Sequence, residues 1–195
     1  MNIAFSALPA FVEHEGRRRR LYPYFNRILA VLMIQEDPNI FDSDKIEAAC
    51  SLIVDGPPSV ALYEKALTAI IGQQDKPESD EPPTFDFLQD ADLIYAAFRQ
   101  TYGIDLRTQC DVMHWRVFIA LFNGLPDGTR FSQVVHIRTC DMPKPTSENG
   151  EQRAKLAKLK AIYAIREPEG AAQRRLARKM QAMANSFIQK AGEKT

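Results

Sequence analysis

The sequence has few cysteines, no net charge and no long apolar run. Its 195 residues include three cysteines, Cys50, Cys110 and Cys140, without CxxC spacing. An odd number of cysteines without a regular spacing argues against a disulfide framework and is typical of a protein whose thiols are reduced. Lys plus Arg and Asp plus Glu each number 25, so the whole chain exerts no long-range pull on nucleic acid or anionic lipid. No apolar run approaches the roughly 18 to 20 residues that span a bilayer, and no basic region precedes the first apolar residues. We therefore expect a cytoplasmic protein.

Familiar catalytic motifs are absent as well. The sequence contains no GxGxxG, GxxxxGK[ST], HExxH or GxSxG pattern. Carboxylate pairs, such as Asp90 with Asp92 or Asp42 with Asp44, fall at expected helix starts, where capping and solvation account for them. We expect no enzyme activity and no cofactor, and we look for function on binding surfaces.

The first patterned segment, from Phe11 to Tyr24, predicts a β-hairpin. Its short apolar ends surround Glu15-Gly16, and glycine tolerates the positive φ of a hairpin turn. The segment includes four consecutive arginines, Arg17 to Arg20. In a strand these side chains alternate between two faces. A solvated hairpin arm is the favoured interpretation, and contact with phosphate or an acidic partner is the alternative.

Three helices are predicted next. The first carries apolar residues at helical spacing and ends at Asp37-Pro38; the second begins at Ser43 as a cap; the third begins near Ser59 and ends before Gly72. Their apolar faces are Phe25, Ile28, Leu29, Leu32 and Met33; Ile46, Ala49, Cys50 and Ile53; and Leu62, Ala66, Leu67, Ile70 and Ile71.

Residues 73–84 are rich in proline and acidic side chains and nearly free of apolar ones. Such a composition buries too little surface to order itself. We interpret it as an acidic linker between an amino-terminal α+β unit, 1–72, and a carboxy-terminal helical unit, 85–195. A long ordered loop on one continuous domain is the alternative. The fold class expected is mainly α, a helical bundle with a small hairpin.

The strongest helical pattern follows the linker. Asp86 with Gln89 resembles a capping box, and Gly103 is placed to close the helix. A second helix stops at Gly124-Leu125-Pro126, and Thr129 is placed to cap a short third one. The expected stripes, which we assign to the core, are Phe87, Ala91, Ile94, Tyr95, Phe98 and Tyr102; Trp115, Phe118, Ile119 and Phe122; and Phe131, Val134 and Val135.

Two Cys/His pairs have the spacing of metal ligands. Cys110 and His114 are four residues apart, as are His136 and Cys140. Two thiolates and two imidazoles suit tetrahedral zinc. No glycine-rich knuckle accompanies them, so the favoured interpretation is a half-buried His114 beside Trp115 and incidental thiols, with no metal site.

The tail from Glu148 onward is predicted to be helical and basic, with eleven Lys or Arg against five Glu. Leu156, Leu159 and Tyr163 form a short apolar stripe, and a break follows at 167–170. Intramolecular docking of the last helix is favoured over a protein partner, and nucleic acid or lipid comes last. Its candidate contact residues are Leu176, Met180, Met183 and Phe187 on the apolar stripe and Arg174, Arg175, Arg178 and Lys179 around it.

The segment 85–165 resembles the bacteriophage gene-product-fifteen family, found in the tail gene cluster of long-tailed phages and prophages. The resemblance before residue 85 is one of outline only, and the four arginines, Cys110, Cys140 and the helix from Ala171 are not part of the pattern. The residues that carry it are Asp86, Asp90, Ala91, Ile94, Tyr95, Phe98, Tyr102-Gly103-Ile104-Asp105-Leu106, His114-Trp115, Phe118, Leu121, Gly124-Leu125-Pro126, Phe131, Arg138 and Lys158 to Ala164.

The resemblance implies a tail assembly chaperone. Such a protein works in the host bacterial cytoplasm, coats the apolar, helical tape measure protein, helps recruit tail tube protein, self-associates, and is absent from the mature virion. Expected contact surfaces are the basic last helix and the exposed edges of the helical pair between Phe87 and Phe122. Two alternatives stay open: a structural tail or head-to-tail connector component, and a DNA-binding accessory protein using Arg17 to Arg20 and Arg174 to Lys179.

Overall fold

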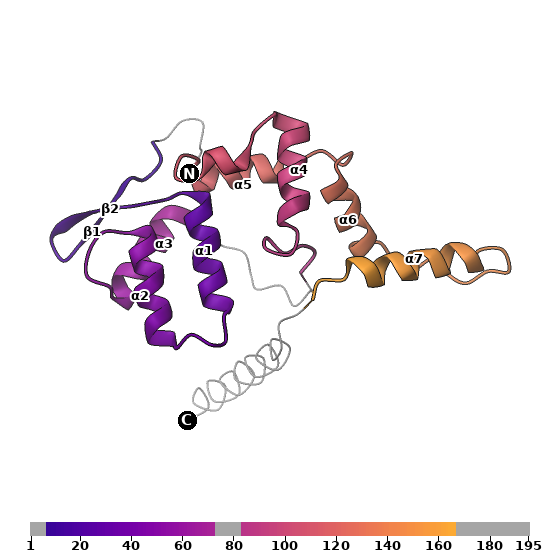
Figure 1. The fold of residues 1–195 in the computed structure, drawn as a ribbon, viewed down its shortest axis with the longest axis horizontal. Coiled ribbons are helices and arrows are strands. Elements are labelled where there is room, and N and C mark those ends of the chain that lie inside the picture. The colour runs from indigo at the N-terminus through magenta and orange to yellow at the C-terminus, as the bar shows by residue number, and fades with distance from the viewer. Residues whose placement is uncertain (1–6, 73–82, 167–195) are drawn as a thin grey trace, which may run out of the picture.

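The computed structural model describes residues 7–72 and 83–166. This part of the chain is mainly helical, as predicted, with seven α-helices and a two-stranded antiparallel hairpin. Figure 1 shows an elongated arrangement with the hairpin near one end and α7 at the other. The elements are β1 (Phe11–His14), β2 (Arg17–Arg20), α1 (Phe25–Glu36), α2 (Asp42–Ile53), α3 (Val60–Ile71), α4 (Ala91–Tyr102), the 3-10 helix η1 (Leu106–Gln109), α5 (Trp115–Asn123), α6 (Arg130–Thr139) and α7 (Gly150–Tyr163).

The predicted linker, 73–84, lies almost entirely outside the described residues, and the division of the chain into two units stays a prediction. A continuous cluster of buried apolar residues joins α1, α2 and α3 to α4, α5 and α6.

The hairpin is confirmed, including its turn. Phe11 pairs with Arg20 and His14 with Arg17. Glu15 and Gly16 have φ values of 50° and 70°, as a two-residue hairpin turn with two left-handed residues requires. The Arg18 guanidinium lies 3.9 Å from the centre of the Phe11 ring. The arginines therefore pack partly on their own strand pair.

Helices α1, α2 and α3 pack in chain order, and two predicted details were wrong. Helix α3 begins next to Ser59, as expected, and the Ser59 hydroxyl caps it by accepting from the Leu62 N–H at 3.2 Å. Ser43 does not cap α2, which begins at Asp42; its hydroxyl donates to Asp44 instead. Met33 is 54% exposed, because it falls on the edge of α1 that no neighbour covers.

Phe118 on α5 lies at the centre of an aromatic stack. Its ring stacks on Phe25 at 5.0 Å, on Phe98 at 5.3 Å and on Trp115 at 5.7 Å. The predicted stripes therefore meet across α4 and α5. Gly103 closes α4 with φ 68°, as expected, whereas η1 was not predicted.

Backbone contacts fasten α1 and α3 to α5. The Trp115 N–H donates to the Pro23 carbonyl at 2.7 Å, and the Phe25 N–H donates to the Met113 carbonyl at 3.1 Å. The Arg116 guanidinium donates to the Ala69 and Ile70 carbonyls at 2.7 and 2.8 Å. Helix ends leave such carbonyls unpaired, so Arg116 closes the last turn of α3.

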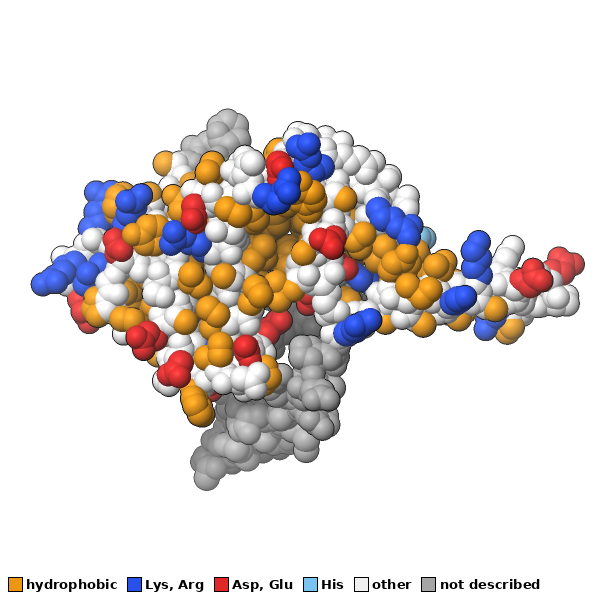
Figure 2. Space-filling view, viewed as in Figure 1, with side chains coloured by type: hydrophobic (Ala, Val, Ile, Leu, Met, Phe, Trp, Pro, Cys, Tyr) orange, Lys and Arg blue, Asp and Glu red, His pale blue; other side chains and the backbone are white. Residues whose placement is uncertain are grey.

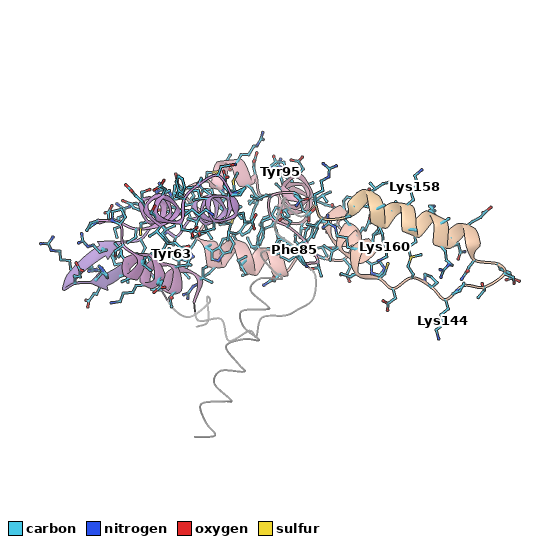
Figure 3. The ribbon with its side chains drawn as sticks, turned by 90° about the horizontal axis from the view of Figure 1, so that it is seen from below. Tyr63, Phe85, Tyr95, Lys144, Lys158 and Lys160 are labelled. Carbon is cyan, nitrogen blue, oxygen red and sulfur yellow. The ribbon has the colours of Figure 1, made fainter. Side chains whose placement is uncertain are left out.

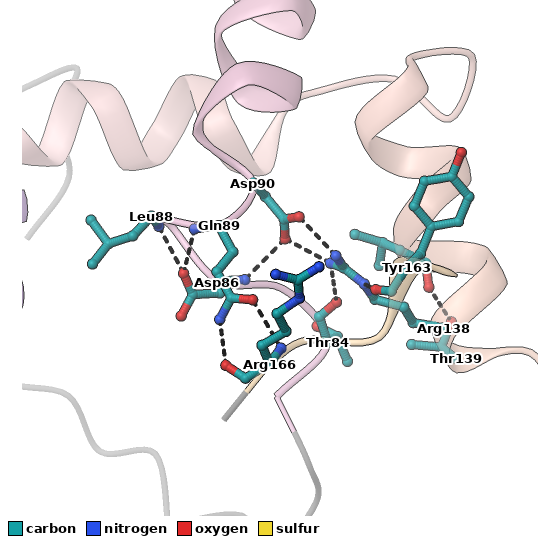
Figure 4. Close-up of polar contacts among 10 residues, drawn as sticks. Thr84, Asp86, Leu88, Gln89, Asp90, Arg138, Thr139, Tyr163 and Arg166 are labelled. Carbon is teal, nitrogen blue, oxygen red and sulfur yellow. Dashed lines mark hydrogen bonds and ion pairs between the residues drawn. The ribbon is translucent and has the colours of Figure 1, made fainter. Parts of the chain in front are cut away.

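The start of α4 differs from the prediction. Asp86 does accept from the Leu88 and Gln89 N–H groups, but α4 begins only at Ala91. Asp90 is not a solvated helix-start carboxylate: it is 2% exposed and accepts two hydrogen bonds from Arg138 of α6, at 2.6 and 2.7 Å. Burial of a carboxylate requires such a partner, and Figure 4 shows the pair where α4, α6 and the end of α7 meet.

Helix α7, predicted from the basic tail, extends away from the body and has no buried residue. Its stripe residues Leu156, Leu159 and Tyr163 are half-buried. The helix packs on α6, and Lys160 donates to the Arg138 carbonyl at 2.9 Å. Lys144, on the loop before α7, points away from the helix (Figure 3).

Candidate functional site: an apolar groove between two helices

An open cavity of about 470 Å³ lies between α1 and α4. Figure 2 shows it as a central hollow where hydrophobic side chains gather. This volume is within the range of about 300–1,000 Å³ common for ligand pockets. Its lining residues, which we call the groove, are Phe25, Leu29, Phe87, Ala91, Asp92, Ile94, Tyr95, Leu106, Arg107, Cys110 and Phe118.

Helical spacing builds the two walls of the groove. Phe25 and Leu29 lie one turn apart on α1, and Ala91, Ile94 and Tyr95 share one face of α4. Leu29 and Tyr95 are half-exposed and Ala91 is exposed. The same stripes that reach the core therefore leave their outer edges uncovered, which is the surface expected for binding an apolar partner.

The rim near η1 carries an ion pair. Arg107 donates to both carboxylate oxygens of Asp105, at 3.1 and 2.9 Å, and its guanidinium lies 5.4 Å from the centre of the Tyr95 ring. The hydrogen bonds from Arg107 lower the pKa of Asp105 to about 2. The pair therefore stays ionised at any pH at which the protein works.

The opposite end of the groove, where α1 ends and α4 begins, is acidic. Glu36 is the last residue of α1, and its pKa is raised by burial and, to a smaller extent, by the carboxylate of Asp86. Asp92 is exposed on the groove wall. Figure 2 shows acidic side chains at the lower end of the hollow.

The last described residues of the chain reach this acidic end. The Arg166 N–H donates to Gln89 Oε1 at 2.8 Å, and Gln89 Nε2 donates to the Arg166 carbonyl at 2.7 Å. Gln89 is two residues before Ala91, the first groove residue of α4. Both backbone polar groups of Arg166 are thus held at the start of α4, near the ion pair of Asp90 with Arg138 (Figure 4).

The groove lining suits binding better than chemistry. Cys110 is the sole thiol among the lining residues, and no histidine lines the groove with it. A nucleophilic cysteine needs an adjacent base or cation within hydrogen-bonding reach, and the hydrogen bond found for Cys110 Sγ is a long contact of 3.8 Å with the Leu106 carbonyl. Apolar walls with charged ends match a groove that accepts an amphipathic helix.

The candidate zinc ligands do not form a site in the described part of the chain, where no group of three or more His, Cys, Asp or Glu could hold a metal. Cys110 is exposed, and Cys140 is half-buried at the end of α6. His114 caps α5 through Nδ1, which accepts from the Arg116 N–H at 3.0 Å. Burial, with a further contribution from Arg116, lowers the pKa of His114 to about 4, so the imidazole is neutral.

The predicted contact residues of the last helix, from Arg174 to Phe187, lie outside the described residues. The groove itself was missed as a site, because its stripe residues were assigned wholly to the core. In the structure Tyr95 is half-exposed and directly follows the buried Ile94. This exposure depends on which elements pack against α4, so the apolar spacing of the stripe does not reveal it. Arg138 was singled out by the resemblance, but nothing in the sequence indicated its partner Asp90.

The described part of the chain is thus mainly helical and carries an open, mainly apolar groove. Comparison with protein families matches residues 5–165 to the family described as Bacteriophage Gp15 protein. The chain belongs to this family and is a bacteriophage protein, which confirms the resemblance. The comparisons with curated proteins and with solved structures give no match. In the described part of the chain, no helix has the length and apolarity needed to cross a membrane.

Proposed function

We propose that this protein is a non-enzymatic tail assembly chaperone of the host cytoplasm, whose groove binds apolar helical segments of the tape measure protein. The groove is the observation that supports this. A helix presenting apolar side chains at i, i+3 or i+4 and i+7 fits such a surface. The acidic end near Glu36 and the Arg107 rim would orient the charges that flank those side chains.

The arm made by α7 is the proposed surface for tail tube protein or for a second copy. Ile162 is 60% exposed on α7 and Met142, on the loop before it, is 38% exposed. A helix without buried residues gains little stability from packing on its own chain, because most helical stability in proteins comes from burying an apolar face.

The deciding experiment is co-expression with the neighbouring tape measure protein. The chain should keep the tape measure protein soluble and co-purify with it. Ala91→Trp fills the groove from an exposed position, whereas Ala96→Trp places the same side chain on an exposed site of α4 outside the groove. Excluding one apolar anchor removes about 1.5–3 kcal/mol, so Ala91→Trp should reduce capture roughly tenfold or more. Equal capture by both variants would refute groove binding.

A permanent structural component is the competing hypothesis. It predicts that the chain remains in purified particles, whereas the chaperone hypothesis predicts its absence. Mass spectrometry of virions separates the two.

DNA binding is supported by one observation, the exposed side chains of Arg17, Arg18 and Arg20 on β2. Such binding should weaken steeply as salt rises. If the chain does not retard DNA even at low salt, this candidate is removed.

A further inference from the structure

We propose that the segment 171–190 of the same chain occupies the groove when no partner is bound. Four observations lead to this occupant: the place where the described chain ends, the length of chain that follows, the charges at the acidic end, and the apolar pattern of the segment. The regulatory consequence, that a partner must displace the segment, rests on the proposed function; the occupancy itself does not.

The first observation is the exit point. Arg166 is held by two hydrogen bonds to Gln89, and Asp90, the next residue, is fixed by Arg138. The chain therefore leaves the body at the start of α4, on the side that faces α6 and α7. Ala91, on the groove wall, follows Gln89 by two residues.

The second observation is reach. Twenty-nine residues follow Arg166, and residues 167–175 alone can span up to about 30 Å when extended. A tether this short holds the segment at an effective concentration on the order of 1 mM. Even if the free segment bound the groove weakly, with a Kd of about 100 μM, the tethered segment would then occupy roughly nine grooves in ten.

Charge and pattern complete the match. The segment carries Arg174, Arg175, Arg178 and Lys179. Asp92 lies on the groove wall, and Glu36 and Asp86 lie where α1 ends and α4 begins. Opposite charges orient the approach of a segment more than they fix its affinity. The apolar residues that would enter the groove are Leu176, Met180, Met183 and Phe187, spaced for one helical face.

Cys110 provides a native probe, because it lines the groove and is exposed, while Cys50 is buried. The test uses the full chain with Cys140→Ser and Met183→Cys under mild oxidation. A disulfide between Cys110 and the thiol introduced at position 183 should form within one chain, migrate as a monomer and be independent of protein concentration. The matched control is Asn185→Cys, on the opposite face of the predicted helix, which should cross-link about tenfold less.

Ala91→Trp should release the segment and lower the Met183→Cys cross-link severalfold, whereas Ala96→Trp should leave it unchanged. Equal cross-linking from Asn185→Cys, or a cross-linked dimer in place of a monomer, would overturn the proposal; the dimer would mean that a second copy fills the groove. Since no tape measure protein is present, this result is independent of the proposed function. If the chain captures the tape measure protein but the Cys110 cross-link does not form, only the occupancy of the groove by segment 171–190 is refuted. If the cross-link forms but the tape measure protein is not captured, only the chaperone function is refuted.

Discussion

Removing the Arg138 guanidinium should destabilise the protein more than any change of a surface charge. Arg138 donates to both Asp90 oxygens, at 2.6 and 2.7 Å, and to the Tyr163 carbonyl at 2.6 Å. The Arg138 side chain is 11% exposed and that of Asp90 is 3% exposed. Arg138→Ala leaves a buried carboxylate without its counter-ion, a change that costs about 3–5 kcal/mol.

Urea unfolding followed by the fluorescence of Trp115 measures this cost. With a denaturant dependence of about 2 kcal/mol per molar urea, the unfolding midpoint should fall by roughly 1.5–2.5 M. Arg99→Ala is the matched control. Arg99 is exposed and donates one hydrogen bond, to the Gly103 carbonyl, so its removal should change the unfolding free energy by no more than about 0.5 kcal/mol.

A double-mutant cycle isolates the ion pair itself. Asp90→Ala leaves Arg138 buried and unpaired, so it should cost a similar amount as Arg138→Ala. The double variant should cost much less than the two single costs added, with a coupling energy of about 2 kcal/mol or more, since groups in one buried network are not additive. If the double variant loses as much unfolding free energy as the two single variants added together, the assignment of a buried ion pair is refuted.

Three further predictions concern helix ends and pH. Ser59→Ala should lower the unfolding free energy by about 1 kcal/mol through the lost cap, while Ser43→Ala, which removes no cap, should change it by a few tenths at most; urea unfolding compares them. Gly103→Ala should cost about 1–2 kcal/mol for the left-handed backbone alone, because an added Cβ there meets nothing within 4 Å; a larger loss would indicate a steric clash. The folded-state pKa of His114, about 4, lies below the usual value of about 6.5, so stability should be complete above pH 6.5 and decline as the pH falls toward 4. His114→Asn keeps an oxygen that can cap α5 but has no imidazole to titrate. Its melting temperature should therefore lack the part of the fall between pH 6.5 and 4 that His114 causes.

The helices of the fold could be predicted because their signals are local. The spacing of Phe25, Ile28 and Leu29, the glycine at 103 and the hydroxyl of Ser59 each act within a few residues of the chain. The Glu15-Gly16 turn belongs to the same class. These features depend on backbone conformation and one helical face, and both can be read from the sequence.

The pairings between distant residues could not be predicted. Asp90 resembles any acidic residue at a helix start until α6 brings Arg138 against it. Lys45 of α2 is likewise buried: it is 8% exposed and donates to the Gln35 carbonyl at 3.0 Å. The partner is 10 residues away in the sequence for Lys45 and 48 residues away for Asp90. The tertiary fold brings each pair together, and no periodicity in the sequence predicts such a pairing.

The extent of the family match separates the groove from its proposed occupant. The match ends at residue 165, one residue before Arg166 is fastened to Gln89, and it includes every residue that lines the groove. The basic segment from residue 171 lies outside the match. Under our two proposals, the groove binds the partner and the segment controls access to the groove. Replacing the segment should therefore change how readily the groove is filled and leave intact the surface that the partner contacts.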